Sequence, residues 1–435
     1  MKRILLKLIA LTAAAITLVS GCECTRIDPE SKEYDNVVIL YSAGYNSLSS
    51  YLKDDIKDLK QGYLPSKRSK DAMVVVSHLT SGGNDYITPV QPVIINMANG
   101  SKGIVLDTVK VYPDDLCLTK AADMKEVLND VHKMFPAKHY GMVFSSHSTG
   151  WLPKGYYSKP EDYDFKSSGG KALSAKRSVA LPDGAVPYYE EIENEFPGMP
   201  AVKSLGMTNR TISGQKYSYE IDLPEFAASI PFHLDYLLLD ACLAGGIEVA
   251  YELKDKCDVI VFSQAEVLAE GFNYLTLASD LIEHDGDYIS VADHYYVNFA
   301  QKTHSIERSA TISVIDCTKL DGLASVCGTL FEKYRGQIGA LNPSGIQRYY
   351  RGKHHWFYDM EDILVKAGIN DSEKQQLASA LGACVLYNEA TDEFLGEFKI
   401  QTHCGFSMYL PNNGSEYLDD FYRTLQWNKA TKLVD

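Results

Sequence analysis

Residues 235–246 read DYLLLDACLAGG, and this segment carries the strongest structural signal in the chain. Its apolar part, residues 235–239, has the length of a buried strand, and residues 243–253 have the apolar spacing of a helix. A buried strand that passes directly into a helix is typical of parallel βαβ units. The segment therefore predicts an α/β fold in which Cys242 lies at the end of a central strand.

The same alternation of strand-length and helix-length segments extends outward in both directions. Further strands are expected at residues 37–42, 72–79, 140–146, 259–263 and 310–315. Helices are expected at residues 46–60, 120–135, 223–229, 274–283 and 291–302. Residues 86–112 alternate like a hairpin with its turn at Asn99-Gly100. The pattern predicts a mostly parallel central sheet flanked by helices, followed by a largely helical C-terminal extension.

The 435 residues suit one large core or two domains. Periodicity is lost between residues 150 and 215, where a long loop is expected. The expected organisation is a leader at 1–21, a tether at 22–35, a main domain at 36–316 and a mostly helical region at 317–435 packed on it.

The N-terminus has the pattern of an export signal, with Lys2 and Arg3 before an apolar stretch that ends in Val-Ser-Gly-Cys. This ending resembles the lipobox of bacterial lipoproteins, in which the cysteine, here Cys22, becomes the lipid-carrying N-terminus. The resemblance implies a lipid-anchored protein of the bacterial cell envelope, at the outer membrane, in the periplasm or on the cell surface. A plain secretory signal is the alternative, because the small-residue site fits both kinds of cleavage.

The formal net charge of −15 argues against nucleic acid as a partner, because an acidic surface repels phosphate backbones. The cysteines show no zinc-binding spacing, so no metal site is expected and most should be buried small hydrophobes. The basic and aromatic cluster from Arg351 to Trp356 is interpreted as a solvated loop that enters the next helix. A monomer is expected.

Two strand ends could carry chemistry: residues 141–151, GMVFSSHSTGW, and the segment that contains Cys242. In parallel α/β sheets, reactive groups gather at the carboxyl ends of strands. A helix that begins directly after Cys242 would favour the thiolate, and its entry would offer the backbone N–H of Cys242 to an oxyanion. His147 would supply and accept the proton. A structural buried cysteine and a structural histidine are the alternatives.

The Asp-Ala-Cys-Leu segment, with its apolar strand before it and residues 248–251 after it, resembles the nucleophile region of clostripain-type peptidases. These belong to the caspase-like clan with gingipains and legumains. Residues 38–48, 262–266 and 405–411 are also similar to that family. The resemblance implies a caspase-like α/β/α sandwich and peptide-bond hydrolysis through an acyl-enzyme on a Cys242–His147 dyad. It implies no required cofactor, and calcium only by family analogy.

Specificity is expected to depend on Asp240, because residues i and i+2 of a strand point to the same side and its carboxylate would lie beside the thiol. The resemblance gives the matching aspartate the task of binding a basic P1 side chain, so the partners are polypeptides with Arg or Lys. Glu266 and Glu270 are further candidates for this pocket. An N-cap role for Asp240 and solvated positions for both glutamates are the alternatives.

One residue departs from the family pattern: relatives have Gly directly after the histidine, whereas this chain has Ser148 at the expected oxyanion site. The departure leaves a rival open, a catalytically inactive, surface-anchored binding or scaffold protein with the same fold. By analogy with relatives, the long loop is expected to be cut by the enzyme itself, after one of the basic residues Lys171, Lys176 and Arg177. A solvated loop with incidental basic residues is the alternative.

Overall fold

The computed structural model describes residues 33–80, 91–164, 181–187, 199, 208–212, 215–283 and 286–435. Within it, Tyr34–Asp435 form one compact unit. The leader, Cys22 and the three basic residues expected at the cleavage site, Lys171, Lys176 and Arg177, lie outside the described residues. In the described part of the chain, no helix combines the length and apolar character needed to cross a membrane.

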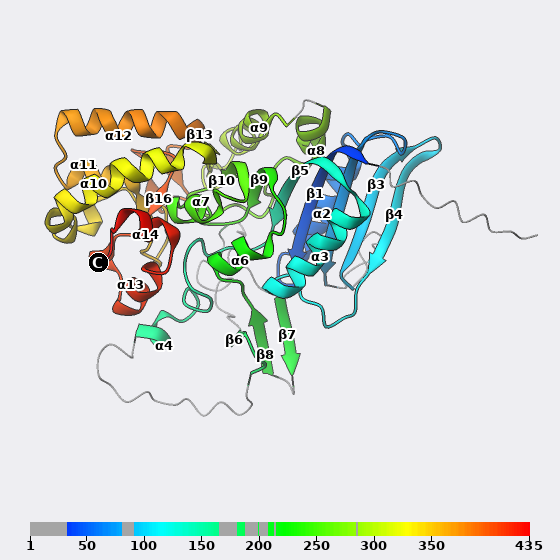
Figure 1. The fold of residues 1–435 in the computed structure, drawn as a ribbon, viewed down its shortest axis with the longest axis horizontal. Helices are drawn as coiled ribbons and strands as arrows, with labels where there is room; N and C mark the ends of the chain where they lie inside the picture. The colour runs from blue at the N-terminus through cyan, green and yellow to red at the C-terminus, as the bar shows by residue number, and fades with distance from the viewer. Residues whose placement is uncertain are drawn as a thin grey trace, which may run out of the picture. The chain divides into compact units, whose positions relative to one another are not determined.

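A nine-stranded sheet forms the centre of the molecule, in the order β13-β11-β10-β9-β5-β1-β2-β3-β4 (Figure 1). The five middle strands, β10 to β2 in that order, run parallel, and two antiparallel strands extend the sheet at each edge. The strands are β1 (Tyr34–Gly44), β2 (Asp71–Leu79), β3 (Val93–Gly100), β4 (Gly103–Val111), β5 (Ala137–Ser145), β9 (Leu234–Asp240), β10 (Cys257–Phe262), β11 (Thr311–Asp316) and β13 (Val385–Ala390). The predicted mostly parallel sheet is confirmed.

Helices cover both faces of this sheet. Phe144 of β5 contacts Phe226 of α6 with ring centroids 4.9 Å apart, whereas Asp240 of β9 accepts a hydrogen bond from Tyr274 of α8. Phe144 pairs with Leu239 and Ser145 with Asp240, and successive strand residues face opposite ways. Therefore α6 and α8 lie on opposite faces, which confirms the α/β/α sandwich. The helices are α2 (Ser49–Gln61), α3 (Ala121–Met134), α4 (Pro160–Asp164), α6 (Leu223–Ser229), α7 (Ile247–Leu253), α8 (Tyr274–Ala278), α9 (Tyr288–Ala300), α10 (Leu320–Gly339), α11 (Met360–Lys366), α12 (Asp371–Cys384), α13 (Glu416–Tyr422) and α14 (Gln426–Thr431).

The C-terminal region is helical for most of its length, but it also adds a strand to the main sheet. β13 pairs with β11. The apolar pattern did not indicate β13, because its side chains are only half-buried or exposed. Shorter strands of the same region form two-stranded pairs, β12 (Tyr358–Asp359) with β16 (Ser407–Met408) and β14 (Glu393–Phe394) with β15 (Phe398–Lys399).

The segment expected to be one long loop, 150–215, contains regular structure. β6 (Ala185–Pro187), β7 (Thr208–Ile212) and β8 (Gln215–Tyr219) form an antiparallel sheet in the order β6-β8-β7. The expected absence of secondary structure is therefore wrong for its described part. The hairpin of β3 and β4 is confirmed, but its turn lies at Ser101 and Lys102, two residues later than expected.

Helix α7 begins at Ile247 with Gly246 as its N-cap, four residues later than expected. Leu243 donates its N–H to the Ala265 carbonyl at 2.9 Å, and Gly245 donates to Ser263 at 2.7 Å. These long-range bonds hold residues 243–246 as an extended turn against the end of β10. A Cβ on Gly245 would lie 2.6 Å from the Gln264 nitrogen, so glycine is needed for this close approach.

Candidate active site

The two predicted catalytic loops leave neighbouring strands at the same level. β5 and β9 pair in parallel with Ser145 opposite Asp240, and neighbouring strands lie about 4.8 Å apart. His147 and Cys242 each follow two residues later. The register thus brings both loops to the carboxyl edge of the sheet side by side.

The loops also touch through their backbones. Gly150, at φ +61°, lies against Leu243: a Cβ on this glycine would be 2.4 Å from the Leu243 carbonyl oxygen. Leu243 itself has φ +56°, an uncommon conformation for a branched side chain. Such a backbone is stable only when surrounding contacts hold it, and it lies directly after the predicted nucleophile.

The expectation that the positive end of a helix lies at Cys242 is wrong. Cys242 lies four residues before the N-cap Gly246, and the field of a helix terminus falls off within one turn. The Cys242 turn is held by β10 and by the late segment at Ser407, whose N–H donates to Gly245 at 2.8 Å.

The thiol of Cys242 is fully buried. Its sulfur accepts the N–H of Val267 at 3.0 Å, and it lies 3.6 Å from the carbonyl oxygen of the same residue. The segment after β10 therefore covers the sulfur in this conformation. A substrate carbonyl reaches the sulfur only after that segment moves.

His147 is also largely buried, at 5% exposure. Its Nε2 lies 3.5 Å from the hydroxyl oxygen of Ser47, which follows the end of β1. A third parallel strand end thus contributes to the same edge. Ser47 was not predicted as a site residue: it falls within the helix expected at residues 46–60, but that helix begins later, with Leu48 as its N-cap.

Asp240 lies at the end of β9 with 1% exposure. Its Oδ2 accepts hydrogen bonds from Tyr274 at 2.6 Å and from Ser145 at 3.1 Å. Burial and the neighbouring Asp240 carboxylate raise the pKa of the Tyr274 hydroxyl well above its ordinary value. The N-cap alternative for Asp240 is wrong, because Gly246 holds that position.

Glu266 is not solvated but forms a buried ion pair with Arg351. The two side chains are 6% and 3% exposed, and the guanidinium binds both carboxylate oxygens, one of them at 2.8 Å. Burial alone would lower the pKa of Arg351, but the hydrogen bonds and charge of Glu266 raise it above its usual range. The expectation of a solvated loop around Arg351 is therefore wrong for this residue. Composition indicated only that the cluster is basic.

The remaining predicted site residues lie in different surroundings. Glu270 is exposed and pairs with Lys302. Ser148 accepts the N–H of Gly150 at 3.0 Å, so its hydroxyl bonds within its own loop. The backbone N–H of Cys242 remains the other predicted oxyanion donor.

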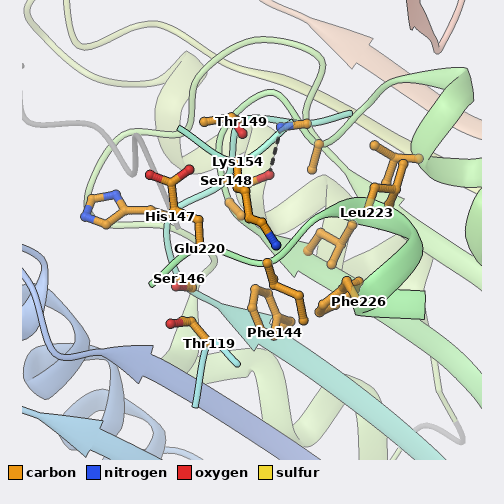
Figure 2. A pocket seen from close by; sticks show the side chains of 16 residues that line it. Thr119, Phe144, Ser146, His147, Ser148, Thr149, Lys154, Glu220, Leu223 and Phe226 are labelled. Carbon is orange, nitrogen blue, oxygen red and sulfur yellow. Dashed lines mark hydrogen bonds between the residues drawn. The ribbon is translucent and has the colours of Figure 1, made fainter. Parts of the chain in front are cut away.

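A cavity of about 70 Å³ opens beside the His147 loop. Figure 2 shows the side chains that line it. Its walls include residues 146–150 and Ala241, so both catalytic loops border it. Sequence reasoning missed Glu220 and Lys154, which also line it. Among the residues that the structure describes, no group of three or more His, Cys, Asp or Glu side chains could hold a metal ion.

The sheet topology is that of the caspase-like class, with the loops of His147 and Cys242 at neighbouring strand ends. The model of the clostripain family matches residues 218–434. The chain belongs to the clostripain family.

Solved structures of similar fold span nearly the whole chain. An inactive zymogen protease from Parabacteroides distasonis matches with a TM-score of 0.68 and 22% identity over 92% of this chain and 98% of its own. A secreted cysteine protease from Bacteroides thetaiotaomicron matches with a TM-score of 0.69 and 23% identity, over 92% of this chain and 99% of its own. A structure of a secreted cysteine protease from the same organism, in complex with an irreversible peptide inhibitor, matches with a TM-score of 0.68 and 20% identity, over 92% of this chain and 100% of its own. No curated protein matches the chain in sequence.

Proposed function

We propose that the chain is a cysteine endopeptidase that cleaves after Arg or Lys, with Cys242 as nucleophile and His147 as proton carrier. The observation that carries the proposal is the parallel register of β5 and β9, with Ser145 opposite Asp240. This register supports a dyad because His147 and Cys242 each follow the Ser145–Asp240 pair by two residues, at the ends of adjacent strands. Nucleophile and base must approach within hydrogen-bond reach when substrate binds.

In the proposed reaction the Cys242 sulfur attacks the carbonyl carbon of the P1 residue and forms a tetrahedral intermediate with an oxyanion. His147 takes the thiol proton and gives it to the leaving amine as the C–N bond breaks, which leaves a thioester on Cys242. Water then adds to the thioester with His147 as base, and the acid product leaves as the thiol regains its proton. The oxyanion would be bound by the Cys242 N–H and the Ser148 region.

The preference for Arg or Lys is assigned to Asp240. Asp240 is the last residue of β9 and lies two residues before Cys242, and a buried carboxylate is well suited to bind guanidinium or ammonium. Tyr274 and Ser145 now bind that carboxylate, so a basic side chain would have to compete with two hydroxyl donors. Glu266 is the weaker candidate because Arg351 already neutralises it.

Fluorogenic peptides that end in Arg, Lys, Asn or Asp test this proposal directly. We expect turnover after Arg and Lys, none with Cys242→Ala or His147→Ala, and a weaker basic preference with Asp240→Asn. Tyr274→Phe is the matched control, since it removes one hydrogen bond to the carboxylate but keeps the charge. Turnover only after Asn or Asp would refute the role of Asp240.

An inactive binding or scaffold protein is the second candidate, and the complete burial of Cys242 favours it. The covering Val267 segment would then be permanent. Labelling with a small thiol reagent separates the two: Cys242 of a peptidase should react faster after cleavage of the long loop or when substrate is added. No turnover and no labelling in any preparation would favour the inactive protein.

Activation by self-cleavage after Lys171, Lys176 or Arg177 is part of the proposal. Mass spectrometry of the purified wild type beside Cys242→Ala tests it, and equal cleavage in both would remove it.

Anchoring through a lipid on Cys22 is proposed from the sequence pattern, and Cys22→Ala should then release the protein from membranes. Calcium is proposed from the family resemblance alone: activity that is lost in chelator and restored by Ca²⁺ would support it.

A further inference from the structure

The cavity beside His147 lies on the opposite face of the sheet from Asp240. Phe144 and Leu239 line it, and these residues pair with each other one position before the Ser145–Asp240 pair. Because strand residues alternate between faces, the cavity belongs to the face covered by α6, whereas Asp240 faces α8. Residues 146–150 border it, and Figure 2 labels the first four of them.

The cavity and Asp240 thus lie on opposite faces of the sheet, at the edge where the loops of His147 and Cys242 begin. A peptide whose P1 side chain bound at Asp240, and whose chain continued past His147, would reach the other face. The next side chain, P1′, then lies at the mouth of the cavity, because Ala241 and the loop after His147 both line it.

One carboxylate among the polar groups that line the cavity has an oxygen without a donor. Glu220, directly after β8, is 9% exposed, and its Oε2 accepts the N–H of Gly155 at 2.6 Å. Its Oε1 is buried and accepts no hydrogen bond from any residue that the structure describes. Burial raises the pKa of the Glu220 carboxyl to about 7. A buried acceptor without a donor is unfavourable, so it gains from a ligand that donates.

Two other polar side chains at the cavity, those of Lys154 and Thr119, have partners. The Lys154 ammonium lies 3.5 Å from Asp222 and 3.3 Å from Glu225, and the Thr119 hydroxyl donates to the Tyr219 carbonyl at 2.9 Å. The apolar walls come from side chains such as Phe226 and Val249. The cavity therefore combines apolar walls with several polar groups, and among these Oε1 of Glu220 is an acceptor without a donor in the described part of the chain, as ligand pockets commonly offer.

We propose that this cavity is the S1′ subsite, and that it selects a P1′ threonine or serine whose hydroxyl donates to Oε1 of Glu220. The inference rests on the proposed peptidase function and deepens it. Size supports a small side chain, because a cavity of roughly 150 Å³ holds benzene and this one measures about 70 Å³. Aromatic and long charged P1′ side chains should be rejected on size.

Paired peptides that differ only in P1′ threonine or valine provide the test, because the two side chains have nearly the same shape. With Arg at P1, and above about pH 8 so that the Glu220 carboxyl is ionised, we expect kcat/KM for threonine to exceed that for valine on the order of tenfold, as for one hydrogen bond to a charged group. Glu220→Gln should bring this ratio close to one, because its amide presents N–H donors where Oε1 accepted. Glu332→Gln, a matched change at an exposed glutamate of α10, should keep the wild-type ratio.

Each outcome decides the question. A ratio near one in the wild type, or a full ratio in Glu220→Gln, overturns the S1′ proposal while the peptidase function stands. If no peptide is cleaved, the proposed function fails, and calorimetric binding of the same uncleaved peptides to Cys242→Ala tests the subsite by itself. Roughly tenfold tighter binding of the threonine peptide, lost with Glu220→Gln, supports it, and equal binding overturns it.

Discussion

The buried ion pair between Glu266 and Arg351 gives the sharpest prediction for stability. Arg351→Met should destabilise the protein by about 3–5 kcal/mol, because it leaves the Glu266 carboxylate buried without its counter-charge. The magnitude follows from the burial of both side chains, at 3% and 6% exposure, and from the two hydrogen bonds to the carboxylate.

A double variant isolates the cause. Combining Arg351→Met with Glu266→Leu should recover most of the loss, since apolar residues of similar volume often replace a buried pair at little net change. Lys57→Met is the matched control: its pair with Asp54 is exposed, at 62% and 70%, and its loss should change stability by less than about 1 kcal/mol.

Urea unfolding followed by fluorescence measures all three variants, with the midpoint shift taken at a constant slope. A loss below about 1 kcal/mol for Arg351→Met would show that the pair contributes little and that the side chains separate easily. A double variant as unstable as the single one would refute the explanation by an uncompensated charge.

Three further predictions concern single positions. Gly150→Ala should lower kcat/KM and reduce the free energy of unfolding by about 1–3 kcal/mol, because the φ of Gly150 is +61° and the added Cβ would lie 2.4 Å from the Leu243 carbonyl oxygen. Gly336→Ala in α10 is the control: nothing lies within 4 Å of its added Cβ, so urea unfolding should show unchanged or higher stability. Tyr274→Phe should lower stability by about 1.5–3 kcal/mol through loss of its 2.6 Å hydrogen bond to the Asp240 carboxylate, and an unchanged unfolding midpoint would contradict this. Burial raises the pKa of Glu248 from its usual 4.5 to about 7, so the folded chain holds the proton more tightly than the unfolded chain. The stability that protonated Glu248 contributes, roughly 3 kcal/mol, is present below pH 4.5 and is lost as pH rises through 7. Glu248→Gln should remove that part of the pH dependence, which unfolding measurements at pH 5 and pH 8 would show.

Much of the sheet could be predicted because its parallel strands are buried on both faces and therefore appear as continuous apolar runs. The segments around β1, β5 and β9 were located within a few residues for this reason. β13 was missed because an edge strand lacks such a run, and the short strands between residues 185 and 219 lie in a segment of turn-forming composition.

The start of α7 shows why the chemistry of the site was harder to predict. The apolar spacing after Cys242 is compatible with a helix from Leu243, but hydrogen bonds to Ala265, Ser263 and Ser407 hold residues 243–246 in another conformation. Those partners lie up to about 160 residues away in the chain, beyond the reach of any local pattern. The helix dipole argument for the thiolate failed with it.

The sequence alone determined the α/β class, the central parallel strands and the positions of His147 and Cys242 at strand ends, because burial of these strands leaves apolar runs in the chain. Tertiary structure alone decided which distant groups meet: Glu266 with Arg351, Val267 over the thiol, and Glu220 in the cavity beside His147. The reason is physical. Burial leaves a local pattern in the chain, whereas the partner of a buried charge or sulfur depends on how remote segments pack.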